Sequence, residues 1–406
     1  MKQSAYFKLV TLNGESYLFP FGQALMSSPV SVKLDEGGVF LWDALSKDIT
    51  LSDLQSRFFS FVHADEEERD QVNSDVETFI NNLRMRSMIV DYPNDLSILK
   101  ASFLTVPEIH GHELFPMLIA ATGIEIRKDD SISEKLLNLI PKEFLTFKSI
   151  RHHFDYHIQI LPKNPNINLS DGSTVFEDWE LRIVRFTNGF RIFYKEYNHF
   201  KIVEATDSVL TIYQEPVPVN GDYAKIQQEL SRICRAGVYL KLEKKQIYSL
   251  HAASVDIDGT SAGTGAILFT AKSGTGKSTQ AGIMNQTFGS TMINGDCNLI
   301  SLKNNKAIVM GQPWCGTSEI YDLKEHKLTA VVKLVRTKEK EIPSVQKLNK
   351  SEAAVTILQR IISPLWTKEQ LQDAARWAEE FSKTTTVFRM KCDLTDRGIR
   401  QLMEHL

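Results

Sequence analysis

The chain is poor in cysteine and has no long apolar run. Its 406 residues include only four cysteines, Cys234, Cys297, Cys315 and Cys392, which lie far apart and share no metal-ligand spacing. The longest apolar stretch, residues 115–124, is far below the roughly 18 residues needed to cross a bilayer. The start shows no charged region, apolar region and cleavage site in succession. These features predict reduced thiols, a cytoplasmic location and no membrane partner.

The sequence also lacks a dominant charge. Forty-seven basic and fifty acidic residues give a net charge of −3, so no global field attracts nucleic acid or an anionic membrane. The expected third helix of the N-terminal unit carries Glu66, Glu67, Glu68 and Asp70 with few basic residues, whereas a phosphate backbone demands a basic face. We therefore expect no nucleic-acid partner. The length predicts two or three globular domains.

Residues 1–92 read as a small α+β unit. Asn13-Gly14 lies between two strand-like runs, which is the strongest short hairpin signal. Asp65 is placed to cap a helix, with Glu68 three residues further on. A turn-rich segment at 91–95 ends the unit. We expect strands over 6–11, 15–20 and 30–34, and helices over 39–45, 51–58 and 65–83.

The middle of the chain carries little functional information. Residues 93–147 are expected to form a mostly helical linker region, and a third unit spans 148–406. This unit begins with a β-rich lead-in, and an amphipathic helix over 222–236 is expected to stop at Gly237. The strands expected in the lead-in cover residues 157–161, 179–186, 190–195 and 209–213.

Residues 266–279 carry the most specific pattern. An apolar run leads into Ala-Lys-Ser-Gly-Thr-Gly-Lys-Ser at 271–278, the phosphate-binding loop pattern with alanine replacing the first glycine, and helical character follows. The glycines let successive N–H groups face phosphate oxygens, and the helix presents its positive end. Lys277 is expected to reach the β- and γ-phosphates, and the Ser278 hydroxyl to bind Mg²⁺. The candidate nucleotide-binding residues are Ser273, Gly274, Thr275, Gly276, Lys277, Ser278 and Thr279.

Such a loop also needs a carboxylate and an acceptor for the hydroxyl proton. Asp296 follows a short strand pattern at 291–293 and is the candidate metal ligand. His251 lies on the strand-like run 249–257 before the loop. A lone histidine in an apolar run is more often a core residue, but a strand beside the phosphate loop also suits a proton acceptor. Lys277, His251 and Asp296 are therefore the candidate catalytic residues.

A glycine-bounded loop follows the next pair of expected strands. It contains Pro313, Trp314, Cys315 and Gly316. The tryptophan fits two interpretations equally well: a packed turn, or one wall of a pocket for the phosphate acceptor.

These motifs together resemble the HPr kinase/phosphorylase-like serine kinases, which share a fold group with phosphoenolpyruvate carboxykinase. The similarity lies in Leu-His-Ala-Ala-Ser-Val from 250, the loop ending at Thr279, Asn-Gly-Asp296 and Gly-Gln-Pro-Trp-Cys-Gly316. It covers roughly residues 150–406. The resemblance implies transfer of the γ-phosphate of ATP to a serine hydroxyl with Mg²⁺, and it places His251 where that family has an active-site histidine.

One position departs from that family, which commonly has two adjacent aspartates where this chain has Gly295-Asp296. One member of the pair is usually given the role of base. In this chain His251 could take that role, Asp296 could serve as both ligand and base, or Glu319 could contribute.

The N-terminal unit resembles PqqD-type domains, which have a winged-helix-like architecture and recognise the leader of ribosomally made precursor peptides. The similarity rests on Val32-Lys-Leu34, Val39-Phe-Leu-Trp42 and the spacing of Asp75, Phe79 and Leu83. It implies that a leader adds as a strand beside the third strand, with side chains lodged against the last helix. The expected leader-binding residues are Val30, Val32, Leu34, Phe79 and Leu83, although many of them also suit a core.

Together the two halves predict a kinase for a serine or threonine of a precursor peptide, using ATP and Mg²⁺. Holding the leader raises the effective concentration of the acceptor. One alternative is a kinase for a carrier protein or small molecule. A second is a nonenzymatic, nucleotide-gated peptide adaptor. This alternative stays open because Gly295 stands where the kinase family has an acidic residue. Members of the kinase family often form multimers, so the resemblance also allows a homo-oligomer.

Overall fold

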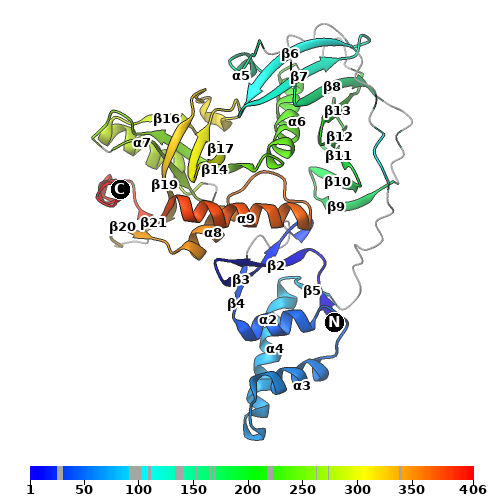
Figure 1. Cartoon of the computed structure of the whole chain (residues 1–406), viewed down its shortest axis with the longest axis vertical. Coiled ribbons are helices and arrows are strands. Elements are labelled where there is room, and N and C mark those ends of the chain that lie inside the picture. The colour runs from blue at the N-terminus through cyan, green and yellow to red at the C-terminus, as the bar shows by residue number, and fades with distance from the viewer. Residues whose placement is uncertain are drawn as a thin grey trace.

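The computed structural model describes most of the chain and shows a mixed α/β protein. In Figure 1 a narrow N-terminal part extends from a wider body that contains two large sheets. The described residues are 1–24, 31–90, 102–105, 107, 111–132, 140–150, 153–163, 167, 171–216, 223–261, 263–272, 274–337 and 341–406.

The N-terminal part forms from the strands and helices that the sequence predicts. Asn13 and Gly14 have φ angles of 49° and 83°, which fit the expected tight hairpin turn. The Thr50 hydroxyl accepts the Asp53 N–H at 3.1 Å and starts a helix, and the Asp65 N–H donates to Glu68 at 3.1 Å. The elements are β1 (Lys2–Gln3), β2 (Phe7–Leu12), β3 (Glu15–Pro20), β4 (Val32–Leu34), α2 (Glu36–Ala44), α3 (Leu51–Val62), η1 (Glu66–Glu68), α4 (Arg69–Met85) and β5 (Ile89–Val90).

The sheet β2–β3–β4 is covered on both faces. Leu18 of β3 packs into the core made with helices α2 to α4. Its neighbours Tyr17 and Phe19 point the other way and share a core with Trp377 and Phe381 of the body. Because alternate residues of a strand face opposite sides, one strand joins the N-terminal helices to the body.

The second sheet corrects the expectation of a helical linker. Phe115, Met117 and Ile119 are buried at alternate positions, which is the period of a strand. The turn that follows consists of Ala120 and Ala121 with positive φ, so the usual glycine or asparagine signal is missing. Within the described part of 93–147 only α5 (Lys142–Leu145) is an α-helix. The domain boundaries at 92 and 147 remain predictions.

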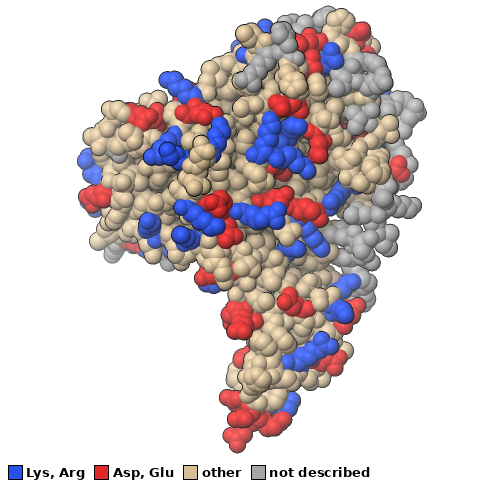
Figure 2. All heavy atoms as spheres, viewed as in Figure 1, with Lys and Arg blue, Asp and Glu red and all other residues tan. Residues whose placement is uncertain are grey.

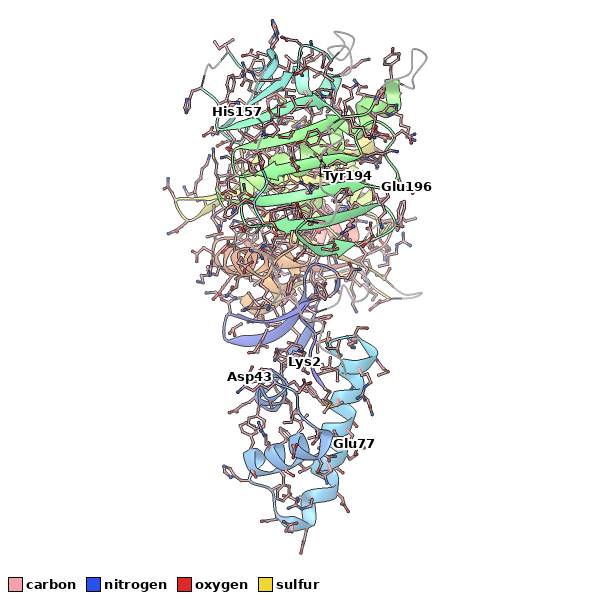
Figure 3. All side chains as sticks on the ribbon, turned by 90° about the vertical axis from the view of Figure 1, so that its right-hand side faces the viewer. Lys2, Asp43, Glu77, His157, Tyr194 and Glu196 are labelled. Carbon is pink, nitrogen blue, oxygen red and sulfur yellow. The ribbon has the colours of Figure 1, made fainter. Side chains whose placement is uncertain are left out.

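This eight-stranded sheet contains the strands expected in the lead-in. Its order is β6–β7–β8–β13–β12–β11–β10–β9, with β8 parallel to both β7 and β13. Figure 3 looks onto the face of this sheet, with His157 and Tyr194 labelled on its strands. The strands are β6 (His112–Ile119), β7 (Thr122–Lys128), β8 (Tyr156–Pro162), β9 (Ser173–Glu177), β10 (Leu181–Phe186), β11 (Gly189–Tyr194), β12 (Ile202–Thr206) and β13 (Val209–Gln214).

Helix α6 (Tyr223–Glu243) packs against this sheet and runs past Gly237, where the sequence predicted its end. A Cβ at Gly237 would lie 2.6 Å from Cδ2 of Leu210 on β13. The glycine therefore serves close packing between helix and sheet, and it does not end the helix.

The third sheet holds the phosphate-loop segment. Strand β15 lies between β14 and β19, is fully buried and runs parallel to β19, so the loop after it starts in the middle of the sheet. The strands are β14 (Ile247–Asp256), β15 (Ala266–Thr270), β16 (Thr291–Asn294), β17 (Cys297–Lys303), β18 (Lys306–Met310), β19 (His326–Arg336), β20 (Ser344–Lys347) and β21 (Thr386–Cys392). The helices are α7 (Lys277–Phe288), η3 (Gly316–Ser318), α8 (Lys350–Leu358), α9 (Lys368–Thr384) and α10 (Arg397–Met403).

The surface agrees with the balanced composition. Figure 2 shows basic and acidic side chains intermixed over the body, and acidic ones gathered at the far tip of the N-terminal part. Within the described ranges no helix is both long and apolar enough to span a bilayer.

Candidate active site

The segment between β15 and α7, which the sequence predicts to bind phosphate, contains two glycines with positive φ angles. Gly274 and Gly276 have φ angles of 73° and 111°, and at neither position would a Cβ come within 3.4 Å of another residue. Glycine is therefore required here by the backbone conformation and not by crowding. Ser273 lies outside the described residues.

Two side chains brace this loop and the helix that follows it. The guanidinium of Arg336 donates to the carbonyl oxygens of Gly274 and Thr275. Gln280 donates to the Asp393 carbonyl at 2.7 Å, which ties the first turn of α7 to the segment after β21. Because the first N–H groups of a helix lack partners within it, the start of α7 is suited to bind an anion. Ser278 and Thr279 are exposed there.

Lys277 stands at the start of α7 in a partly desolvated place. Burial lowers the pKa of its ammonium group, the charge of Asp296 raises it, and the nearby Arg360 lowers it further. The structure thus brings Lys277 close enough to Asp296 for their charges to interact, as the sequence predicts for a phosphate lysine and a metal carboxylate.

His251 and Asp296 form a pair. His251 lies where β14 changes its neighbours. The strand pairs with β17 up to His251, and after it with β15 and β16. Its Nε2 is 3.2 Å from Oδ1 of Asp296, and the Cys297 thiol is 3.2 Å from Oδ2. The hydrogen bond from His251 lowers the pKa of Asp296 to about 2, and Cys297 and Lys277 act in the same direction. Asp296 is therefore ionised and is a weak base.

Asn294 fixes the turn that carries Asp296, a role that the sequence analysis missed. Its side-chain oxygen accepts the N–H groups of Asp296 and Cys297, each at 3.0 Å. Its amide group donates to the Trp314 carbonyl at 3.0 Å. One buried side chain thus holds both the carboxylate turn and the loop at 313–316. Its position beside Gly295-Asp296 was the only signal in the sequence.

The loop at 313–316 combines the two interpretations of its tryptophan. Trp314 is only 5% exposed, donates through Nε1 to the Ser231 carbonyl at 3.1 Å, and packs edge-on against Phe144 and Tyr239. It is a packed turn, yet it also lines a large cavity together with Pro313, Cys315 and Gly316. A Cβ at Gly316 would lie 2.7 Å from Cβ of Asp296, so this loop rests directly against the carboxylate.

Further cations surround the site, and no local motif marks them. The carbonyl of Arg360 accepts the His251 N–H at 2.9 Å, and its guanidinium Nε is buried without a hydrogen-bond partner among the described residues. Burial lowers the pKa of both Arg360 and Lys333, and the Arg360 charge acts on Lys333 as well as on Lys277. A desolvated positive cluster of this kind attracts an anion with several charges. Glu319, by contrast, is exposed.

The residues beside the loop suit Mg²⁺ bound together with phosphates. The Ser278 hydroxyl and the Asp296 carboxylate offer the hard oxygen ligands that Mg²⁺ prefers. In the described part of the chain no three His, Cys, Asp or Glu side chains gather into a metal cage. That fits an ion which usually takes one or two protein ligands and completes its shell with phosphate oxygens and water.

The residues predicted to bind a leader divide into two groups. Leu34 and Leu83 are 6% and 2% exposed and belong to the core of the N-terminal part. Val32 and Phe79 are partly exposed and pack against that core, while Val30 lies outside the described residues. Among the described strands β4 pairs only with β3, so its other edge is unpaired there.

Comparison with known proteins adds little. No protein-family model matches the chain, and no curated protein matches it. One solved structure with some likeness is the Hpr(Ser) kinase/phosphatase from Coxiella burnetii, which is 13% identical and has a TM-score of 0.22. The match covers 39% of this chain and 95% of that one. A TM-score this low supports no conclusion, so function has to be argued from the site.

Proposed function

We propose that the protein is an ATP-dependent kinase that phosphorylates a serine or threonine hydroxyl of a ribosomally made precursor peptide. The observation that carries this proposal is the position of Lys277, at the start of the helix after a phosphate-type loop and beside the Asp296–His251 pair. A loop, a lysine and a carboxylate in this order are the parts that phosphoryl transfer needs.

In this proposal each side chain has one task. The N–H groups at the start of α7 and Lys277 bind the β- and γ-phosphates. Ser278 and Asp296 hold Mg²⁺, which neutralises charge on the phosphate oxygens when bound. Because Asp296 has a pKa of about 2, His251 is the better group to take the hydroxyl proton.

The step itself is a single displacement. A bond forms between the acceptor oxygen and the γ-phosphorus, and the bond from this phosphorus to the bridging oxygen of ADP breaks. The hydroxyl proton moves to the His251 imidazole, and ADP leaves. The sequence left the base open, because Gly295 replaces one of the two aspartates of the kinase family. In this proposal the base is His251.

The N-terminal part supports a peptide as the acceptor. An unpaired β4 edge beside the partly exposed Val32 and Phe79 suits a leader that adds as a strand, because main-chain hydrogen bonds supply the affinity. A leader held there raises the effective concentration of the acceptor at the distant site.

The test separates the two halves. Reading frames beside the gene are searched for a short precursor peptide, which is then incubated with ATP and Mg²⁺ and weighed by mass spectrometry. Lys277→Ala should lower phosphate transfer by about 10²–10³, whereas Lys303→Ala, which changes an exposed lysine on β17, should not.

Val32→Glu should weaken leader binding in calorimetry, while Thr11→Glu, at an exposed position on β2 of the same sheet, should leave it unchanged. Normal turnover by Lys277→Ala would refute the nucleotide site. Unchanged leader affinity in Val32→Glu would refute the β4 edge as the leader site.

A further inference from the structure

A large cavity lies where three parts of the molecule meet. Its volume is about 1090 Å³, and its walls come from the N-terminal hairpin, from the second sheet with α6, and from the 313–317 loop with the segment that joins α8 to α9. Pockets for single small ligands usually measure about 300–1,000 Å³. The cavity is therefore large enough for more than a small acceptor.

One end of the cavity lies next to the catalytic pair, although neither His251 nor Asp296 is among the residues that line it. Gly316 lines it and rests against Asp296, where a Cβ at 316 would be 2.7 Å from the aspartate Cβ. Arg235 also lines it, and the charge of Asp296 acts on this guanidinium. None of the described residues between 274 and 279 belongs to its walls, so the cavity is distinct from the phosphate loop.

The other end is lined by β3 of the N-terminal part and by Gln359, which contacts the residue before the edge strand β4. Gln359 lines the cavity and donates from its amide to the Ser31 hydroxyl at 2.7 Å, one residue before β4. Phe19 and Pro20 of β3 form part of the same wall. The walls of the cavity thus contact Ser31, beside the expected leader-binding strand, through Gln359, and Asp296 through Gly316.

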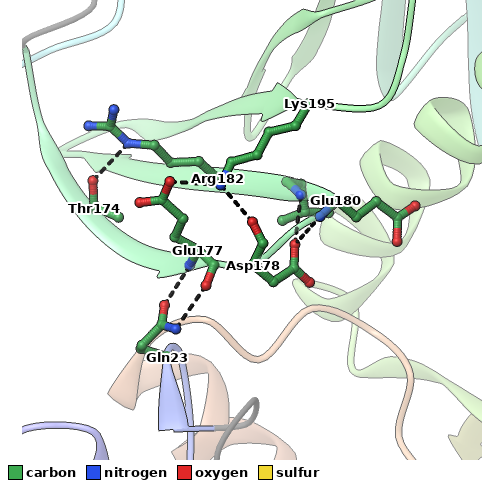
Figure 4. Close-up of polar contacts among 8 residues, drawn as sticks. Gln23, Thr174, Glu177, Asp178, Glu180, Arg182 and Lys195 are labelled. Carbon is green, nitrogen blue, oxygen red and sulfur yellow. Dashed lines mark hydrogen bonds and ion pairs between the residues drawn. The ribbon is translucent and has the colours of Figure 1, made fainter.

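A contact between the Gln23 side chain and the Glu177 backbone stabilises the wall beside this end. Gln23 donates to the Glu177 carbonyl at 2.8 Å and accepts the Glu177 N–H at 2.6 Å, as Figure 4 shows. The neighbouring Phe176 and Glu180 line the cavity. This contact therefore joins the N-terminal part to the second sheet beside the cavity.

The walls offer the groups that bind an extended peptide. Tyr194 and Tyr197 stack with ring centroids 4.4 Å apart and present aromatic surface. Gln227, Gln228 and Ser231 of α6 add donors and acceptors for main-chain amides. Aromatic walls with a few polar groups suit recognition of varied side chains along one backbone.

We propose that this cavity is the acceptor channel, in which the peptide segment after the leader lies extended and brings its serine to Asp296. The proposal rests on the proposed function. It adds the route that connects leader and acceptor, and it makes α6 and the 313–316 loop the surfaces that determine acceptor sequence.

The probe is a degenerate twelve-residue peptide library with one fixed central serine and a photoreactive benzoylphenylalanine two residues beyond it. After irradiation with the full-length protein, mass spectrometry of tryptic fragments should place adducts on residues 227–235 or 313–317. Gln228→Trp and Ala224→Trp each put a bulky side chain at an exposed lining position of α6, and each should lower the adduct yield at least tenfold. Gln372→Trp, exposed on α9 outside the cavity, should not change it.

Phosphate transfer from ATP to the same library is measured in parallel and separates the two claims. Adducts inside the cavity without transfer uphold the channel and count against the kinase. Transfer with adducts only elsewhere, or with equal yield in both tryptophan variants, overturns the channel and leaves the kinase standing. Absence of any adduct, as expected for a small-molecule acceptor, also overturns the channel.

Discussion

Replacing Gly295 by alanine or aspartate should destabilise the protein, because Ser318 already occupies the space. A Cβ at Gly295 would lie 2.4 Å from Oγ and 2.5 Å from Cβ of Ser318. Ser318 cannot move away easily, since its hydroxyl donates to the Cys315 carbonyl at 2.7 Å. The backbone at Gly295 is not in the left-handed region, so the clash is the only cost.

The magnitude follows from overpacking. Forcing extra atoms into a filled space typically costs about 1–3 kcal/mol, so Gly295→Ala should lower the free energy of unfolding by that amount and Gly295→Asp by at least as much. Ser318→Ala removes Oγ but keeps the Cβ at 2.5 Å, and should not relieve the clash. Ser318→Gly removes both atoms and should recover about 1–2 kcal/mol in a double-mutant cycle.

Urea unfolding measures these changes in the free energy of unfolding. It is carried out on the four single variants and on the two double variants that combine Gly295→Ala with each serine change. Gly295→Ala with wild-type stability would contradict the reasoning. So would strictly additive effects of Gly295→Ala and Ser318→Gly. If the double variant Gly295→Asp, Ser318→Gly folds, it also tests whether a second carboxylate changes the pH dependence of phosphate transfer.

Arg360→Ala should lower the rate of phosphate transfer by about 10², because it removes a desolvated cation beside Lys277. Arg360→Lys keeps the charge and should keep part of the rate in steady-state kinetics. Equal losses in both variants would contradict a charge effect. The pKa of Asp296 is depressed in the folded state, so its ionisation stabilises the fold fully above pH 4 and this contribution disappears as the pH falls toward about 2. The stability gap between wild type and Asp296→Asn, in urea midpoints, should therefore shrink from pH 5 to pH 3, and a gap that grows on acidification would show that the sign is wrong.

The sequence by itself predicted the strand, glycine turn and helix of the expected phosphate loop, the N-terminal hairpin and most strands, because these depend on short-range patterns. Asn13-Gly14 requires positive φ, and Gly274 and Gly276 mark a loop that only glycine adopts easily. The helical reading of 93–147 failed because the β6–β7 turn, Ala120-Ala121, has no turn residue to signal it.

Only the tertiary structure decided which distant residues share the site. Arg360 reaches His251 through a backbone hydrogen bond across more than a hundred residues, and Asn294 joins the Asp296 turn to Trp314. The same holds for Leu34 and Leu83, whose apolar pattern fitted both core and groove until packing made them core. Local propensity specifies which backbone a segment adopts, whereas proximity, desolvation and cavity shape depend on how the sheets pack against each other.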